Sequence, residues 1–115
     1  MSRHFEQADG LCDTPDDATR DYLFNQTMLR IKDPQVSLDF YTRVLGMRLV
    51  RKLDFPAMQF SLYFLAYLDE EEASQVPQDD AKRLTYTFGR EAMLELTHNW
   101  GTEKDTDFAL SLIHI

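Results

Sequence analysis

The hydrophobic pattern of this chain predicts four β-strands. The stretch from Tyr22 to Ile31 is rich in β-forming residues, and Met47–Leu53 alternates apolar with basic positions, as a half-exposed strand does. Further strands are predicted at Met58–Tyr67 and at Ala92–Asn99. The tripeptide Asp54-Phe55-Pro56 is expected to end the second strand before the third begins.

One segment, KDPQVSLDFYTRVLGM, carries the clearest helix signal. Asp33 is a natural N-cap, and Pro34 suits the first helical position because its missing N–H costs nothing there. Gly46 can close the helix in a left-handed conformation. These signals predict a helix from about Pro34 to Leu45. Its apolar positions recur at helical spacing: Val36, Phe40, Tyr41 and Val44.

The remaining segments are polar and give weaker signals. Residues 1–20 are predicted to form a flexible acidic tail. The acidic stretch LDEEEASQVPQDDAKR is predicted to be a loop that can include one helical turn, and Leu84–Phe88 is either a short strand or the end of that loop. The element order is therefore β-α-β-β-β, which is an α+β fold.

Composition narrows the function classes. A chain of 115 residues with 43% hydrophobic residues suffices for one packed domain, and its net charge of −8 disfavours nucleic acid as a partner. No apolar run reaches the roughly 20 residues that cross a bilayer, and MSRHFEQADG lacks a signal-peptide core. The single cysteine, Cys12, excludes a disulfide within the chain. We therefore expect a cytoplasmic protein without a membrane partner.

Period-two alternation brings candidate chemistry onto two of the strands. Gln26 and Arg30 share one face of the first strand, and Glu95 and Asn99 share one face of the last. Each strand thus shows a metal-capable oxygen and, roughly 13 Å further along, a second polar group. That spacing suits a ligand with a reacting head and a polar tail.

The same residues also have ordinary structural explanations. A lone glutamate on a strand is usually solvated or paired, and an exposed arginine such as Arg30 commonly forms a surface ion pair. His98 is compatible with a hydrogen-bonded core or edge histidine. An apolar stripe on the third strand is typical of plain core. The pattern by itself therefore predicts only a small α+β domain.

Three longer motifs resemble glyoxalase I, the lactoylglutathione lyase of the vicinal oxygen chelate superfamily. They are QTMLRIKDPQVSLDFYTRVLGM, KLDFPAMQFSLYFLAY and LELTHNWGTE. The resemblance runs from about Asp21 to Glu103 and is interrupted only in the acidic stretch. It implies a βαβββ module, of which glyoxalase I contains two, over residues 21–109.

The resemblance implies a role for each matching position. Gln26 and Glu95 match metal ligands, with Zn²⁺ expected and Ni²⁺ or another divalent metal possible. Arg30 and Asn99 match residues that contact glutathione, whereas His98 matches a residue that is not expected to be a ligand. Four apolar residues match the pocket for the thiol substituent: Phe55, Phe60, Leu62 and Phe64.

The implied reaction isomerises the hemithioacetal of methylglyoxal and glutathione to S-lactoylglutathione. A divalent metal suits it because the ion takes up negative charge as a carbon acid ionises. The family's histidine ligand and its glutamate base lie in the second module, which this chain does not match. No catalytic residue is therefore assigned here, and a homodimer or a second module is expected to complete the site.

The ending LSLIHI departs from the family pattern. It back-translates readily to an adapter used in sequencing libraries, so residues 110–115 are expected to be a non-native tail on a C-terminally truncated record; a genuine short form is the alternative. We expect such a fragment to be inactive alone.

Two other functions remain open from the sequence. One is a non-catalytic protein of the same superfamily that binds and sequesters small molecules. The other is a ring-cleaving dioxygenase, against which Gln26 argues, because those enzymes use a two-histidine, one-carboxylate set.

Overall fold

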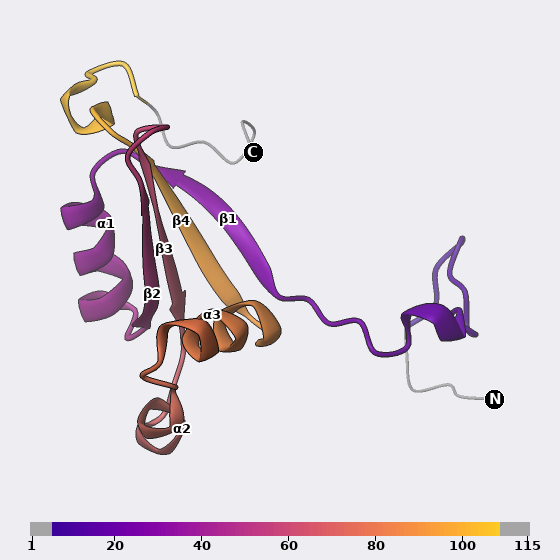
Figure 1. Cartoon of the computed structure of the whole chain (residues 1–115). Helices are drawn as coiled ribbons and strands as arrows, with labels where there is room; N and C mark the ends of the chain where they lie inside the picture. Colours follow the sequence, from indigo (N-terminus) through magenta and orange to yellow (C-terminus); the bar gives the residue numbers. More distant parts are fainter. Residues whose placement is uncertain (1–5, 109–115) are drawn as a thin grey trace.

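The computed structural model describes residues 6–108 as a four-stranded sheet flanked by helices (Figure 1). The strands are β1 (Gln26–Ile31), β2 (Arg48–Phe55), β3 (Phe60–Ala66) and β4 (Met93–Asn99), and their order in the sheet is β1-β4-β3-β2. β1 runs parallel to β4, whereas β3 is antiparallel to both β4 and β2. The predicted α+β class and the four strands are confirmed.

The boundaries of the first two strands differ from the prediction. β1 begins at Gln26 rather than at Tyr22, which is 79% exposed and pairs with no strand. β2 continues through Asp54 and Phe55, so the predicted break there is wrong. These residues pair with β3 across a tight connection, and Ser61 Oγ donates to Asp54 at 2.5 Å. Met58, expected in the third strand, lies in that connection.

The predicted helix is confirmed, with an unexpected last part. It consists of α1 (Pro34–Asp39) followed without a break by a π-helical turn, Phe40–Val44. Asp33 caps it, since its carboxylate accepts a hydrogen bond from the Gln35 backbone N–H at 3.0 Å. Gly46 then reverses the chain with a φ of 80°.

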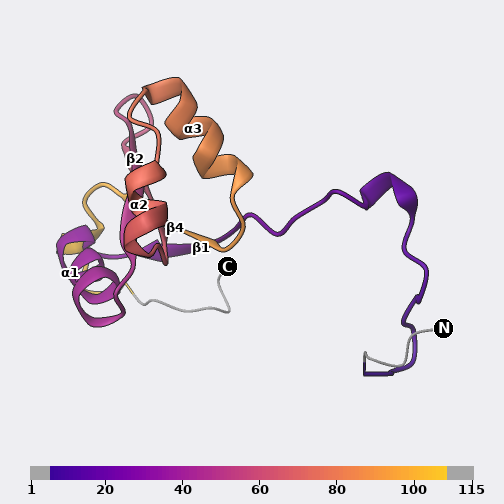
Figure 2. The ribbon, with the colours of Figure 1, turned by 90° about the horizontal axis from the view of Figure 1, so that it is seen from below.

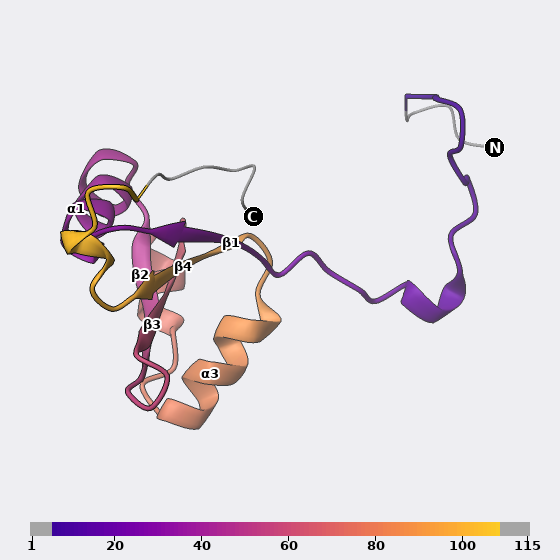
Figure 3. The ribbon, with the colours of Figure 1, turned by 90° about the horizontal axis from the view of Figure 1, so that it is seen from above.

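The sheet divides the core into two clusters, one on each face. On the first face, α1 covers a cluster centred on Ile31, Tyr63, Leu65 and Leu96. On the second face, Phe64 and Met93 belong to a cluster that Tyr86 of α3 helps to cover. Figure 3 shows α1 and α3 on opposite sides of the strands. We call these the α1 face and the α3 face.

The acidic stretch is helical, so the loop prediction is wrong. It forms α2 (Glu70–Gln75) and the start of α3 (Asp80–Gly89), which follow each other beside the sheet (Figure 2). Leu84–Phe88 continues α3, so the expectation of a short strand or a loop end there is also wrong. Asp69 and Asp79 are the N-caps, and their carboxylates accept hydrogen bonds from backbone N–H groups in the first turn of each helix. Acidic residues here thus start helices rather than merely solvate a loop.

Residues 6–24 extend away from the sheet and contain only a short 3₁₀ turn, Asp17–Thr19 (Figure 1). The flexibility of residues 1–20 stays a prediction, and the expected non-native tail at residues 110–115 lies outside the described residues. No helix within residues 6–108 has the length and apolar character needed to cross a membrane.

Candidate metal-binding site

The two candidate ligands lie side by side on the α3 face. Gln26 opens β1, and Glu95 lies on the neighbouring β4, where its register partner is Met28. The Gln26 Nε2 donates a hydrogen bond of 2.6 Å to Glu95 Oε1. Both side chains are half-buried. The sheet therefore brings an amide and a carboxylate from distant parts of the sequence into direct contact.

One atom of this pair is left without a partner. The Oε1 of Gln26 is buried and accepts no hydrogen bond from the described residues. A buried acceptor without a donor is costly unless a ligand satisfies it. The other Glu95 oxygen, Oε2, accepts a weaker bond of 3.2 Å from Thr97 Oγ1. An unpaired amide oxygen beside a carboxylate fits a divalent cation, which favours such oxygen donors.

The donor set is incomplete within the part of the chain that the structure describes. Residues 6–108 contain no cluster of three or more histidine, cysteine, aspartate or glutamate side chains that could hold a metal ion. A cation held by Gln26 and Glu95 alone would therefore need further ligands from water, substrate or another protein segment.

The two polar candidates lie further along the same face. Arg30 is the register partner of Thr97, and Asn99 is the partner of Phe60 on β3. The side chains of both are exposed, and no hydrogen bond or ion pair within residues 6–108 holds Arg30. Asn99 lies two positions beyond the register partner of Arg30, just as Glu95 lies two positions beyond the register partner of Gln26. The pair Gln26 and Glu95 and the pair Arg30 and Asn99 therefore lie one after the other along β1 and β4.

Three of the four apolar candidates form a surface beside these pairs. The rings of Phe55 and Phe60 stack with centroids 4.7 Å apart, and Leu62 lies opposite Thr97. All three are half-buried. Phe64 differs, because it is fully buried and packs edge-on against Phe88 of α3 at 5.2 Å. In this structure Phe64 belongs to the core.

His98 points to the opposite face, away from Glu95. Its Nε2 lies 2.7 Å from Glu103 Oε2. The pKa of the Glu103 carboxyl is lowered, first by its own backbone N–H and then by His98. His98 thus lies apart from the Gln26–Glu95 pair, and the expectation that it is no ligand stays a prediction.

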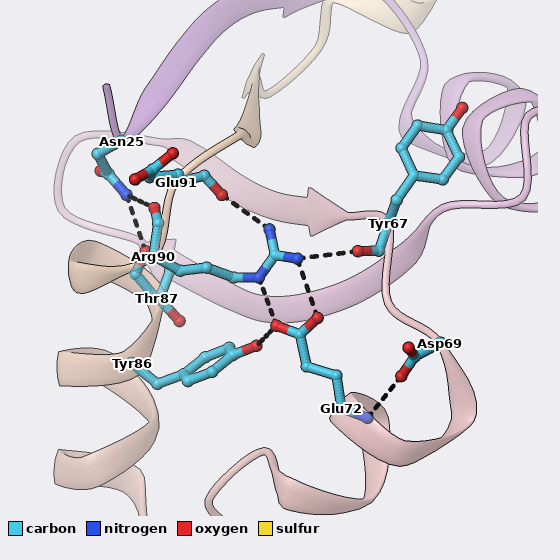
Figure 4. Close-up of polar contacts among 8 residues, drawn as sticks. All are labelled: Asn25, Tyr67, Asp69, Glu72, Tyr86, Thr87, Arg90 and Glu91. Atoms are coloured by element: carbon cyan, nitrogen blue, oxygen red, sulfur yellow. Dashed lines mark hydrogen bonds and ion pairs between the residues drawn. The ribbon is translucent and has the colours of Figure 1, made fainter. Parts of the chain in front are cut away.

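A polar cluster at the start of β4 was not anticipated from the sequence (Figure 4). Glu72 of α2 accepts hydrogen bonds from Arg90 Nε at 2.7 Å and from the Tyr86 hydroxyl at 2.7 Å. The bond from Arg90, and then that from Tyr86, lower the pKa of Glu72 to about 2. Burial, and then the bond to Glu72, raise the pKa of Tyr86.

Asn25 joins this cluster to the first strand. Its Nδ2 donates to the carbonyl oxygens of Thr87, at 3.1 Å, and Arg90, at 2.6 Å. Contacts between residues more than 60 positions apart leave no local pattern, so neither periodicity nor motif spacing could have identified them.

Comparison with known proteins gives a consistent match. Residues 23–115 match the family model described as the glyoxalase/bleomycin resistance protein/dioxygenase superfamily. The chain is 58% identical over 105 residues to a lactoylglutathione lyase of Pseudomonas aeruginosa, covering 91% of this chain and 58% of that relative. It is 52% identical over 100 residues to the lactoylglutathione lyase of Pseudomonas putida, covering 87% of this chain and 56% of that relative. The chain thus spans rather more than half the length of these relatives.

A solved structure agrees with the fold. The trypanothione-dependent glyoxalase I of Leishmania major superimposes with a TM-score of 0.51 at 30% identity, over 77% of this chain and 49% of that one. The module predicted from the sequence is therefore also found in a solved member of the same group.

Proposed function

This chain belongs to the glyoxalase/bleomycin resistance protein/dioxygenase superfamily, and we propose that it forms one βαβββ module of a metal-dependent lactoylglutathione lyase. The proposed reaction converts the hemithioacetal of methylglyoxal and glutathione to S-lactoylglutathione. The observation that carries the proposal is the Gln26–Glu95 contact with its unpaired amide oxygen, on the face that also presents Arg30 and Asn99.

In this proposal Gln26 and Glu95 hold a divalent cation, with Zn²⁺ as our expectation and Ni²⁺ as the alternative. A bound cation would supply stabilisation for negative charge that develops on substrate oxygens. The chain's own contribution is orientation. The sheet fixes both side chains from neighbouring strands, and the half-buried setting limits competition from water.

The rest of the α3 face is proposed to bind the glutathione part of the substrate. Arg30 has a free guanidinium, whose planar fork matches a carboxylate with two parallel hydrogen bonds. Asn99 adds an amide that can both donate and accept. Phe55, Phe60 and Leu62 offer apolar surface for the thiol substituent, and Phe64 supports that surface from the core.

A second copy of the chain or a second module is proposed to complete the site, because the described residues supply only part of a coordination sphere. No catalytic base is assigned to this chain. We therefore expect the isolated 115-residue chain to bind metal weakly and to lack isomerase activity. We also propose a cytoplasmic location.

The test replaces Glu95 by glutamine in a full-length version that contains both modules. Glu95→Gln removes an anionic ligand at nearly constant volume, so we expect bound metal and kcat/KM to fall by at least about 100-fold, more than the loss of an outer-shell partner causes. The matched control is Glu91→Gln, at an exposed glutamate four residues earlier. Metal content by mass spectrometry and turnover of the hemithioacetal are measured.

Equal activity of the two variants would contradict the metal role of Glu95. Binding of S-hexylglutathione by the full-length protein without any turnover would instead support the sequestering alternative.

A further inference from the structure

The register between β1 and β4 determines whether the two candidate ligands meet. Side chains alternate between faces along a strand, so a slip of one residue would carry Glu95 to the α1 face. No hairpin turn fixes this register, because the strands are parallel and the paired residues lie far apart in the chain. Contacts outside the ladder must therefore contribute to it.

Asn25 supplies such contacts immediately before Gln26. Its side-chain amide donates to the carbonyl oxygens of Thr87 and Arg90, at the end of α3 and just beyond it. Its own carbonyl accepts a hydrogen bond of 2.7 Å from the Met93 N–H, and Met93 is the register partner of Gln26. One residue thus connects the start of β1 to both the end of α3 and the start of β4.

The end of α3, the start of β1 and the start of β4 meet at what we call the junction. Arg90 anchors the other side of this junction. Its Nη2 donates to the Tyr67 carbonyl, just beyond the end of β3, at 2.9 Å. Its Nε and Nη2 donate to the two oxygens of Glu72 at 2.7 and 3.1 Å (Figure 4). The Arg90 side chain is only 21% exposed, so these charge-assisted bonds are partly shielded from water. The approach to β4 is therefore fixed to β3 and to α2.

The backbone between this anchor and β4 needs such support. Ala92 has a φ of 59°, in the left-handed region that a residue with a Cβ rarely adopts. A strained residue of this kind persists where its surroundings hold it in place. Asn25 is hydrogen-bonded to Arg90 and to Met93, on either side of Ala92 in the chain, and the Ala92 N–H donates to the Phe24 carbonyl at 3.2 Å.

We propose that Asn25 and Arg90 are positioning residues that hold β1 and β4 in register and thereby keep the Gln26 amide against the Glu95 carboxylate. The effect on metal binding rests on the proposed function, whereas the effect on register does not. Both residues act through the backbone of the junction, and neither contacts the candidate metal.

The first experiment measures the register directly, in the ¹⁵N-labelled chain. Asn25→Asp keeps the shape of the side chain but removes the donating amide. We expect the Met93 N–H to exchange with solvent at least about tenfold faster, and the nuclear Overhauser contact between Gln26 and Glu95 to weaken. Arg90→Lys keeps the charge but loses the fork that reaches Glu72 and Tyr67 together, so we expect the same direction of change.

The control is Ser61→Ala, which removes hydrogen bonds to Asp54 and Trp100 at the opposite end of the sheet. It lowers stability without touching the junction, and exchange is compared at conditions of equal global stability. Unchanged Met93 exchange in Asn25→Asp and Arg90→Lys relative to Ser61→Ala would overturn the proposal. If Asn25→Asp does not fold, Arg90→Lys decides the comparison.

The second experiment measures Zn²⁺ affinity in a full-length version by competition with a chromogenic chelator. We expect both junction variants to weaken binding about 10- to 100-fold, the range typical of residues that orient a ligand, and Ser61→Ala to leave it unchanged. Faster Met93 exchange with unchanged Zn²⁺ affinity would refute the claim that the register determines how Gln26 and Glu95 bind the cation. An unsubstituted full-length protein that binds no metal would refute the proposed function, and the exchange data would still decide the register.

Discussion

The two faces of the sheet use neighbouring residues for different purposes. Leu96 is fully buried in the cluster beneath α1, while Glu95, one position earlier, lies half-buried beside Gln26 on the α3 face. The α1 face is closed by a helix. The α3 face is covered at one end by α3, and its other end presents the exposed side chains of Arg30 and Asn99. In the proposed function, alternate residues of the single strand β4 therefore serve stability and ligand binding.

This difference between the two faces predicts which substitutions affect stability and which affect ligand binding. On the α1 face, side chains contribute by excluding water and filling space, so their loss should appear in the free energy of unfolding. On the open part of the α3 face, side chains are only partly covered, so their loss should appear in ligand binding. The following predictions test that division.

The largest effect on stability is expected for Leu96→Ala. Its side chain is 0% exposed, so truncation should lower the free energy of unfolding by about 2–5 kcal/mol. Leu62→Ala, on the half-exposed part of the α3 face, should cost clearly less. Urea unfolding of both variants measures the difference. Equal losses in the free energy of unfolding would contradict the division between a stabilising α1 face and a ligand-binding α3 face.

An intermediate effect, on binding alone, is expected for Arg30→Ala. A hydrogen-bonded charge contributes about 1.5–3 kcal/mol, so affinity for S-hexylglutathione in a full-length version should fall roughly 10- to 100-fold. Stability should hardly change, because no hydrogen bond or ion pair within residues 6–108 involves this guanidinium. Arg30→Lys should recover only part of the affinity. Calorimetry and thermal unfolding together check the prediction, and a loss of stability without a loss of affinity would contradict it.

The smallest effect concerns Glu72, beneath the junction. Its pKa is lowered from 4.5 to about 2 by Arg90 and Tyr86, so its ionised form favours the folded state. That contribution is fully present above pH 4.5 and is lost as the pH falls towards 2. Glu72→Gln should therefore be less stable than the unsubstituted chain at pH 7, and the difference should shrink in acid.

Urea unfolding between pH 7 and pH 2 gives this difference. Glu71→Gln, at an exposed neighbour in the same helix, is the control and should show little dependence of this kind. A pH-independent difference for Glu72→Gln would show that packing, not charge, explains its effect.

Sequence periodicity predicted which side chains share a face of each strand, because strands obey a fixed alternation, whereas the ligand roles of Gln26 and Glu95 stay a prediction. Gln26 and Glu95 could be placed on one face each, and the structure adds that these faces coincide. The helix after β1 was predictable for a similar reason, since Asp33 and Pro34 are local signals. The helix and the alternation along each strand are local features, whereas the coincidence of the two faces depends on the pairing of β1 with β4.

The missed features depend on information that is either easily misread or not local. The charge of the acidic stretch predicts a loop, although Asp69 and Asp79 stand at positions where N-caps stand. Capping is a local signal, and the high charge of the whole segment obscures it. The junction of Asn25 and Arg90 has no local signal, because its partners meet only after the sheet has formed.

The parallel pairing of β1 with β4 has a consequence for synthesis on the ribosome. Among the strands of residues 6–108, β1 lies at the edge of the sheet and pairs with β4 alone. Gln26 and Glu95 are 69 positions apart. A nascent chain that has exposed β1, α1, β2 and β3 can therefore already pair β2 with β3, but it offers a cation only one of these two oxygen donors. At about 5–20 residues per second, several seconds of translation separate the emergence of the first donor from that of the second.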